Sequence, residues 1–280
     1  MNLLAALVDD AGLFPPESLT MADALARHRA DEAAGHPMLS HRFLCPASRL
    51  GELRTVGAAP AADGGGGPLR LGVILDTGLD GLDAALSEVA SDPALALEML
   101  EVPAPSPDAV DAALEASSGL EPAVFLEGPR SPEWVKAVGA ANQPQRLRGA
   151  KVRCGGAGAE LFPSPDELAA FICACFEHGV PFKATAGLHS AVRHTDPQTG
   201  FVHHGFLNLL LAAVAAAMGA TAGDVATVLG ATDGEALAAE ARAVSGRALS
   251  AARLLFRAYG SCSTSEPLEE AARLGLLGSP

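Results

Sequence analysis

Residues 147–156 read LRGAKVRCGG, residues 180–189 read VPFKATAGLH, and a helical stretch from Pro165 to His178 separates them. Each apolar run has the length of a β-strand and carries one lysine near its C-terminal end, Lys151 in the first and Lys183 in the second. A strand–helix–strand unit places its two strands side by side and parallel. Both lysines are therefore predicted to emerge at one rim of a sheet, the rim where ligands bind in α/β folds.

Similar apolar runs alternate with helical patterns along the rest of the chain. Besides the two lysine strands, the expected strands are Leu3–Val8, Arg42–Pro46, Leu69–Leu75, Ala96–Val102, Ala123–Leu126 and Leu254–Tyr259. Eight strands, each followed by a helix, predict a single (β/α)₈ TIM barrel that spans residues 1–280 as one domain. A helical insertion at about 200–252 is expected between the seventh and eighth strands, because this stretch is too long for one crossover.

Three predicted helices begin with the same serine–proline–acid sequence. They are Ser106-Pro107-Asp108, Ser131-Pro132-Glu133 and Ser164-Pro165-Asp166. Serine caps free N–H groups, proline has no N–H to lose at the first helical position, and the acid faces the positive helix end. The repetition supports a series of strand–helix units.

The composition limits the choice of partners. Of the 280 residues, 49% are hydrophobic, and the formal net charge is −14, which argues against binding to nucleic acid or to an anionic membrane surface. An anionic small molecule would need a local cluster of basic groups. The longest apolar stretch, Phe206–Ala220, falls short of the ~20 residues that a membrane span needs. We expect it to form a buried helix, with a homodimer interface as the alternative.

The cysteines and the N-terminus favour a cytoplasmic location. Five cysteines without regular spacing indicate buried free thiols and not a disulfide framework. The N-terminal residues have no basic region and meet Asp9-Asp10 too early for a signal peptide. The glycine-rich segment Gly57–Pro68 predicts a flexible loop.

Three acidic residues, Asp76, Glu101 and Glu127, lie at the ends of three consecutive predicted strands. Side chains at adjacent strand ends lie close together in a barrel, and carboxylate oxygens suit Mg²⁺ or Mn²⁺. The arrangement resembles the metal site of the enolase superfamily, which implies a base on a later strand: Lys151, Lys183 or His189. This chain has no room for the N-terminal capping domain of those enzymes. The alternative is that the carboxylates pair with nearby lysine and arginine side chains.

A second resemblance begins from the lysines. Lys183-Ala-Thr-Ala-Gly is similar to the Lys-Thr-Ser-Thr-Gly strand of class I aldolases of the deoxyribose-phosphate type, although the order of the two lysine strands is swapped. The resemblance covers about 40 residues. It implies Lys183 as the Schiff-base lysine, Lys151 as the neighbour that lowers its pKa, and Asp76 or Glu127 in proton transfer, without a cofactor. Ion pairs between the lysines and the rim carboxylates are the alternative.

Other candidates would bind or position a substrate. Arg153 with Gly155 and Gly156 forms a candidate anion grip, because arginine offers a fork of donors and glycine lets backbone N–H groups approach an anion. His189, just beyond the seventh strand, is a candidate general acid or base.

The remaining candidates lie at three strand ends. Thr185 lies beside the lysine of the seventh strand. Ser261 and Ser263 end the eighth strand, where barrel enzymes often bind phosphate, and helix capping is their alternative role. The acid pair Asp9-Asp10 at the end of the first strand would shape the rim or lie solvated in a loop.

Five segments together resemble a bacterial family of barrel proteins of uncharacterised function: DAGLFPP, FLCPASRL, KVRCGG, FPSPDELAAFI and PFKATAGLH. The combined interpretation is an enzyme, a lyase, that acts on a small anionic carbonyl or carboxylate compound through Lys183. The first alternative is Mg²⁺-dependent proton abstraction or elimination, a lyase or isomerase reaction, and the second is a non-catalytic ligand-binding barrel. An aldolase needs a lysine free of carboxylates, a metal site needs three converging carboxylates, and a non-catalytic barrel needs every cation paired.

Overall fold

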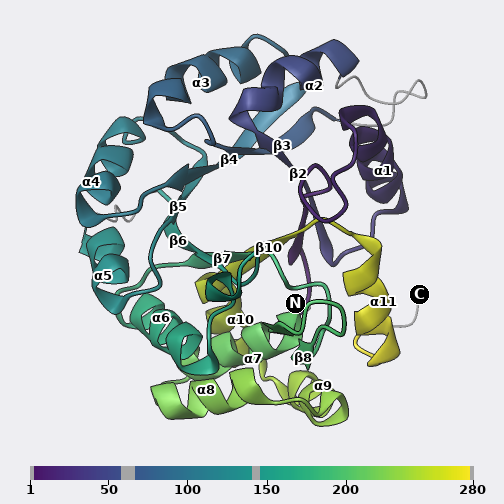
Figure 1. Cartoon of the computed structure of the whole chain (residues 1–280), viewed down its shortest axis with the longest axis vertical. Helices are drawn as coiled ribbons and strands as arrows, with labels where there is room; N and C mark the ends of the chain where they lie inside the picture. The colour runs from purple at the N-terminus through teal and green to yellow at the C-terminus, as the bar shows by residue number, and fades with distance from the viewer. Residues whose placement is uncertain (1–2, 58–66, 141–145, 278–280) are drawn as a thin grey trace.

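The computed structural model describes residues 3–57, 67–140 and 146–277, which form a closed barrel of eight parallel strands surrounded by helices (Figure 1). The strand order around the barrel is β1-β10-β7-β6-β5-β4-β3-β2. The predicted (β/α)₈ TIM barrel is confirmed. Most of the predicted glycine-rich loop falls on residues 58–66, outside the described residues. The barrel strands are β1 (Val8–Asp10), β2 (Leu39–Pro46), β3 (Leu69–Ile74), β4 (Leu95–Pro103), β5 (Ala123–Glu127), β6 (Arg148–Arg153), β7 (Phe182–Thr185) and β10 (Phe256–Ser261).

The helices form a ring outside the strands (Figure 1). The three serine–proline–acid starts are confirmed at α4, α5 and α6, where Ser106, Ser131 and Ser164 each accept a backbone N–H through the side-chain oxygen. The helices are α1 (Met21–Ala34), α2 (Leu50–Val56), α3 (Leu82–Ala90), α4 (Pro107–Ala116), α5 (Pro132–Ala140), α6 (Pro165–Glu177), α7 (Phe206–Ala217), α8 (Ala222–Gly230), α9 (Gly234–Ala243), α10 (Gly246–Leu255) and α11 (Ser265–Arg273).

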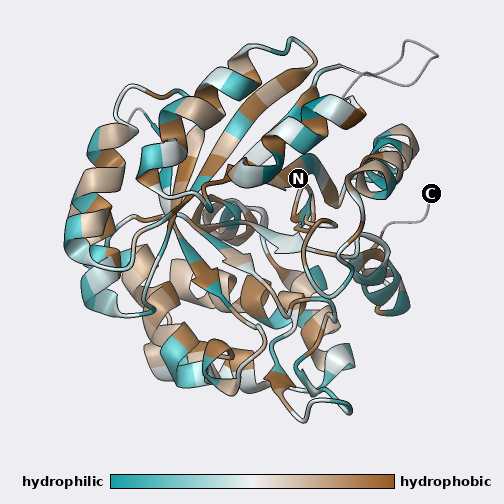
Figure 2. Cartoon of the chain, turned by 45° about the horizontal axis from the view of Figure 1, so that its top comes forward, coloured by the Kyte–Doolittle hydropathy of each residue, from teal (hydrophilic) through white to brown (hydrophobic). Residues whose placement is uncertain are grey.

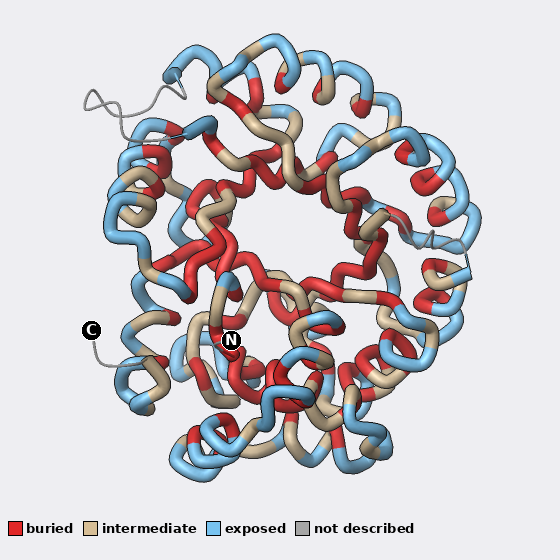
Figure 3. Tube along the Cα trace, turned by 180° about the vertical axis from the view of Figure 1, so that it is seen from behind, coloured by how far each residue is buried: buried red, intermediate tan, exposed pale blue. Residues whose placement is uncertain are grey.

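The hydrophobic core lies between the barrel and the helices. Figure 2 shows apolar residues on the strands and on the inner faces of the helices, and Figure 3 shows a buried ring of strands inside exposed helix backs. Phe182 of β7 contributes to this layer, stacking on Phe256 and meeting Phe171 of α6 edge-on. Because neighbouring strand residues point to opposite faces, Lys183 must point into the barrel. The same alternation turns Lys151 inward between Ala150 and Val152 of the outer core.

The region between β7 and β10 contains more structure than expected. The predicted helical insertion is confirmed: it contains α7, which matches the predicted buried helix, followed by α8, α9 and α10. A short antiparallel hairpin of β8 (His194–Thr195) and β9 (Val202–His203) precedes them and was not predicted. Helix α7 is largely buried, as expected. Within the described residues, every helix is too short or too polar to cross a bilayer.

Strand β1 begins later than the sequence pattern indicated. The expected Leu3–Val8 strand is wrong, because the strand covers Val8–Asp10 and Ala6 has a positive φ that breaks an extended run. This shift places Asp9 and Asp10 within the barrel wall. The alternative of solvated acids is therefore also wrong: both residues are buried.

Candidate functional site

Nine charged side chains form an interior charge network that crosses the barrel. Neighbours along the network carry opposite charges, and the contacts run through Arg70, Glu98, Arg42, Asp9, Lys183, Glu101, Lys151, Glu127 and Arg153. The side chains of Arg70 and Arg153 at the two ends are 43% and 41% exposed, whereas that of Lys183 in the middle is 1% exposed. The network therefore joins one mouth of the barrel to the other through a water-poor centre.

Lys183 connects opposite sides of the barrel. Its Nζ donates to Asp9 Oδ2 of β1 and, at 2.8 Å, to Glu101 Oε1 of β4. Strands β4 and β7 are separated by two others in the barrel order, so this contact passes through the interior. Nζ also lies 5.8 Å from the centroid of the Phe125 ring, which offers its electron-rich face to the cation.

Lys151 occupies the next position in the network. It pairs in register with Lys183 on the adjacent parallel strand, and the neighbouring strands are as predicted. The expectation that both lysines emerge at the rim is wrong, because both side chains are buried in the barrel interior. Its Nζ lies 2.5 Å from Glu101 Oε2 and 2.8 Å from Glu127 Oε2, so Glu101 bridges the two lysines. The other oxygen of Glu127 accepts from Arg153 at 2.9 Å at the C-terminal rim.

Burial and ion pairing shift the pKa values of these groups in opposite directions. Burial alone would raise the pKa of Glu101, but the Lys151 and Lys183 ammonium groups outweigh it and lower the pKa to about 2. The pKa of Asp9 is lowered in the same way by Arg42 and Lys183. Burial lowers the pKa of Lys151, and Glu101 and Glu127 outweigh it, so that the pKa is raised. Lys151 and the carboxylates thus hold each other in the charged state.

Arg42 was not predicted as a site residue, and Asp9 was predicted only to shape the rim or to lie solvated in a loop. Asp9 accepts from Arg42 at 2.7 Å and from the Ser40 hydroxyl at 2.5 Å, which fixes its orientation toward Lys183. Its neighbour Asp10 points outward to Arg27 and His28 of α1. Successive residues of a strand point to opposite faces, so a strand that includes Asp9 and Asp10 turns one aspartate inward and the other outward. The sequence therefore predicts the inward position of Asp9 once the strand is extended to Asp10.

The proposed metal ligands do not converge. Asp76 is exposed and accepts from the backbone N–H of Ser48 at 3.0 Å and from its hydroxyl at 2.5 Å. Glu101 and Glu127 are joined by Lys151. Within the described residues, no group of three His, Cys, Asp or Glu side chains is placed to hold a metal ion. The structure corrects the expected grouping of Asp76 with Glu101 and Glu127.

The glycines of the predicted anion grip have a packing role. A Cβ on Gly155 would lie 3.0 Å from the Gly187 Cα, and one on Gly156 would lie 2.3 Å from Leu161 Cδ1. Gly155 thus lets the loop after β6 approach the loop after β7, and Gly156 leaves room for Leu161 within the loop after β6. Anion binding by these glycines together with Arg153 stays a prediction.

We expect Gly187→Ala to destabilise the protein more than Gly179→Ala, by about 1–3 kcal/mol. The φ angles of Gly187 and Gly179 are both positive, +70° and +64°, so alanine would introduce similar backbone strain at either position. A Cβ at Gly187 would lie 2.8 Å from the Cys154 carbonyl oxygen, whereas one at Gly179 meets nothing within 4 Å. Urea unfolding of the two variants measures the difference, and equal losses would show that the two loops do not pack as described.

The other predicted residues lie around the C-terminal rim. Thr185 is half-buried and pairs in register with Arg153. Ser261 donates to the Ser263 carbonyl at 2.5 Å, and Ser263 accepts from the Glu266 N–H at 3.3 Å. The two serines thus order the turn into α11, which agrees with the capping alternative, and phosphate binding stays a prediction.

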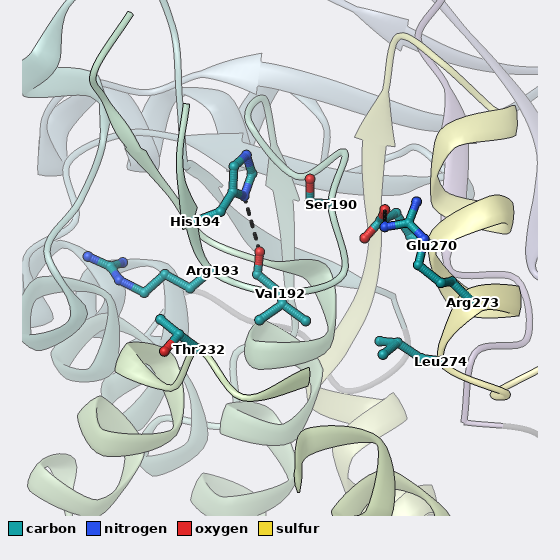
Figure 4. Close-up of a pocket in the computed structure, with 8 residues that line it drawn as sticks. All are labelled: Ser190, Val192, Arg193, His194, Thr232, Glu270, Arg273 and Leu274. Carbon is teal, nitrogen blue, oxygen red and sulfur yellow. Dashed lines mark hydrogen bonds and ion pairs between the residues drawn. The ribbon is translucent and has the colours of Figure 1, made fainter. Parts of the chain in front are cut away.

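A pocket of about 350 Å³ lies between the loop after β7 and helix α11 (Figure 4). Arg273 pairs with Glu270 at 2.6 Å on one side, and Arg193 extends away from them on the other side. None of the residues predicted to bind substrate lines this pocket. The interior charge network is therefore the stronger candidate site.

The comparisons with known proteins assign no family to this (β/α)₈ barrel. No protein-family model matches the chain, and no curated protein matches it. The local resemblances to aldolases and to the enolase superfamily thus have no support beyond the residues that suggested them, and the function has to be argued from the site.

Proposed function

We propose that this barrel is a lyase-type enzyme that forms a Schiff base between Lys183 and a small anionic carbonyl compound. The observation that carries the proposal is the burial of Lys183 Nζ at the centre of the barrel. Its contacts with Asp9 and Glu101 do not meet the requirement for a lysine free of carboxylates, so Schiff-base formation requires this pairing to be broken. Arg153, 41% exposed at the rim, would attract the anionic group of the substrate.

The energetic cost of the network favours a functional role. The interior of a (β/α)₈ barrel is normally filled by branched apolar side chains. Burying a charged group costs several kcal/mol per ion before pairing, and apolar replacements of buried ion pairs are often neutral or stabilising. A barrel that only needed a core would gain little from five cations and four carboxylates. Strongly shifted titrating groups also cluster at functional sites.

The neighbours of Lys183 suit the proton transfers of amine chemistry. Nζ attacks the carbonyl carbon, the oxygen leaves as water, and a C=N bond forms. Lys183 has to give up a proton before attack, and Asp9 and Glu101, which both contact Nζ, are the candidate acceptors. Arg42 and Lys151 act to keep these carboxylates ionised, so the transfer is uphill and has to be drawn forward by the reaction with the substrate. The same carboxylates can then exchange protons with the substrate carbon. Glu127 and Arg153 connect Glu101, through Lys151, to the exposed rim.

The complete pairing of the cations favours one other function, a non-catalytic barrel that binds an anion. Each lysine and arginine of the network contacts a carboxylate, which is the arrangement expected if the charges only neutralise one another. A non-catalytic barrel would bind an anion without forming a covalent adduct. Adduct formation therefore distinguishes the two functions.

Borohydride trapping tests the proposal directly. The full chain is incubated with a panel of small aldehydes, ketones and keto acids, reduced, and read by intact and peptide mass. We expect a reduced adduct on Lys183, and the assignment is simple because the chain has three lysines, Lys136, Lys151 and Lys183.

Two variants serve as controls for the trapping. Lys183→Arg keeps the positive charge but cannot form the adduct, so it should abolish labelling. Lys136→Met removes the exposed lysine of α5 and should leave labelling unchanged. An adduct that persists in Lys183→Arg, or no adduct across the panel, would overturn the Schiff-base function.

A further inference from the structure

Three side chains from separate elements meet at the rim outside the interior charge network. Cys262 follows β10, His189 follows β7, and Glu266 lies in the first turn of α11. Cys262 Sγ lies 3.6 Å from His189 Nε2, and His189 Nδ1 lies 3.0 Å from Glu266 Oε2. A thiol, an imidazole and a carboxylate in this order are the groups of an activated nucleophile, its base and the residue that positions the base. The His189–Glu266 contact is within ion-pair distance but lacks hydrogen-bond geometry.

The surroundings of Cys262 explain why the thiol needs a base. Burial raises the pKa of Cys262, and nearby Glu17 and Glu266 raise it as well. The backbone N–H groups of Glu17 and Ser263 act in the opposite direction, and α11 begins just after this turn, so its positive end also favours a thiolate. The thiolate can thus be stabilised once formed, but the proton needs an acceptor.

His189 is placed to accept that proton. Its side chain is 25% exposed, so the imidazole can exchange protons with solvent while Nε2 faces the buried sulfur. The described contacts of the other four cysteines include no histidine at hydrogen-bond distance. Cys45 and Cys154 are buried thiols whose pKa is raised to about 12.

We propose that Cys262 is a nucleophilic thiol, with His189 as its base, that adds to small uncharged aldehydes. In this step the Sγ proton passes to His189 Nε2, an S–C bond forms at the carbonyl carbon, and the carbonyl oxygen takes the proton back from the imidazolium. The product is a hemithioacetal, with no leaving group and no change in oxidation state. Only 4% of Cys262 is exposed, which limits the electrophile to a small one. Glu17 and Glu266 beside the thiol disfavour an anion.

This site is independent of the Schiff-base proposal. It uses neither Lys183 nor any other member of the interior charge network, and it selects an uncharged electrophile where the lysine site selects an anionic one. Glu266 is a positioning residue, because it reaches the thiol only through His189.

Alkylation of the full chain by iodoacetamide, a small neutral electrophile, tests the proposal by measuring the labelling rate of each cysteine by peptide mass. Cys262 should react more than about tenfold faster than the half-buried Cys173. His189→Gln should bring Cys262 down to the rate of Cys173, and the matched change His178→Gln, just after α6, should have no effect. Glu266→Gln should slow Cys262 in part, and Glu266→Asp should restore the rate.

Propionaldehyde should protect Cys262 but not Cys173, and glyoxylate should protect less.

Three results would overturn the proposal: labelling of Cys262 no faster than that of Cys173, an unchanged rate in His189→Gln, or no protection by propionaldehyde. Cys173 serves as an internal measure of folding, since faster labelling of Cys173 in a variant reports unfolding. His189→Asn then supplies a second variant for the same comparison. Loss of Lys183 adducts in the trapping experiment leaves these outcomes unaffected.

Discussion

Lys183→Met is expected to lower the free energy of unfolding by about 3–5 kcal/mol, the usual cost of removing one partner from a buried ion pair. Lys183 contacts Asp9 and Glu101, which are 0% and 2% exposed. Without the ammonium group, two carboxylates would face each other in the barrel with reduced compensation. Urea denaturation at neutral pH, followed by circular dichroism, measures the loss.

The matched control is Lys136→Met on the exposed surface of α5, which should change stability by no more than about 0.5 kcal/mol. A loss below about 1 kcal/mol for Lys183→Met would mean that water reaches Asp9 and Glu101. That outcome would contradict the dry interior on which the Schiff-base proposal depends.

The barrel could be predicted from the sequence because its signals are local and repeated. The apolar runs of strand length and the serine–proline–acid helix starts each depend on only a few neighbouring residues. Both patterns recur along the chain. The pairing of Lys151 with Lys183 also followed from local rules, since two strands joined by one helix are parallel neighbours.

The composition of the site could be predicted only in part, because contacts across a barrel depend on which face each residue occupies. The predicted pairing of Glu101 and Glu127 with lysine is present. Arg42 was not predicted as a partner, and Asp9 was predicted only to shape the rim or to lie solvated. The expected first strand ended at Val8, two residues before the observed end at Asp10, which left Asp9 outside the wall. A shift of even one residue in strand register reverses the inward and outward faces. The prediction that Asp76 belongs to the site was wrong for a related reason. Strand β3 ends at Ile74, so Asp76 lies beyond the barrel wall and accepts a hydrogen bond from Ser48.

Acid should remove much of the stability that Glu101 contributes. The pKa of Glu101 falls from 4.5 to about 2 on folding, because Lys151 and Lys183 outweigh the effect of burial. A carboxylate whose pKa is lower in the folded state stabilises the protein above its unfolded pKa, and this contribution is lost as the pH falls toward the folded pKa. The full effect is about 3 kcal/mol, of which about 2 kcal/mol should be lost between pH 6 and pH 3.

The difference between wild type and Glu101→Gln isolates this residue, because glutamine does not titrate and the other network carboxylates are common to both proteins. Wild type should be the more stable at pH 6, and its advantage over the variant should shrink by about 2 kcal/mol at pH 3, measured by urea unfolding at each pH. The exposed Glu52, which pairs with Arg49, supplies the matched control: Glu52→Gln should show no comparable narrowing, because solvent screens that pair. A constant difference between wild type and Glu101→Gln would show that Glu101 is not held ionised by the two lysines. The carboxyl group would then titrate in the folded protein as it does in the unfolded chain, and its ion pairs with Lys151 and Lys183 would add no pH-dependent stability.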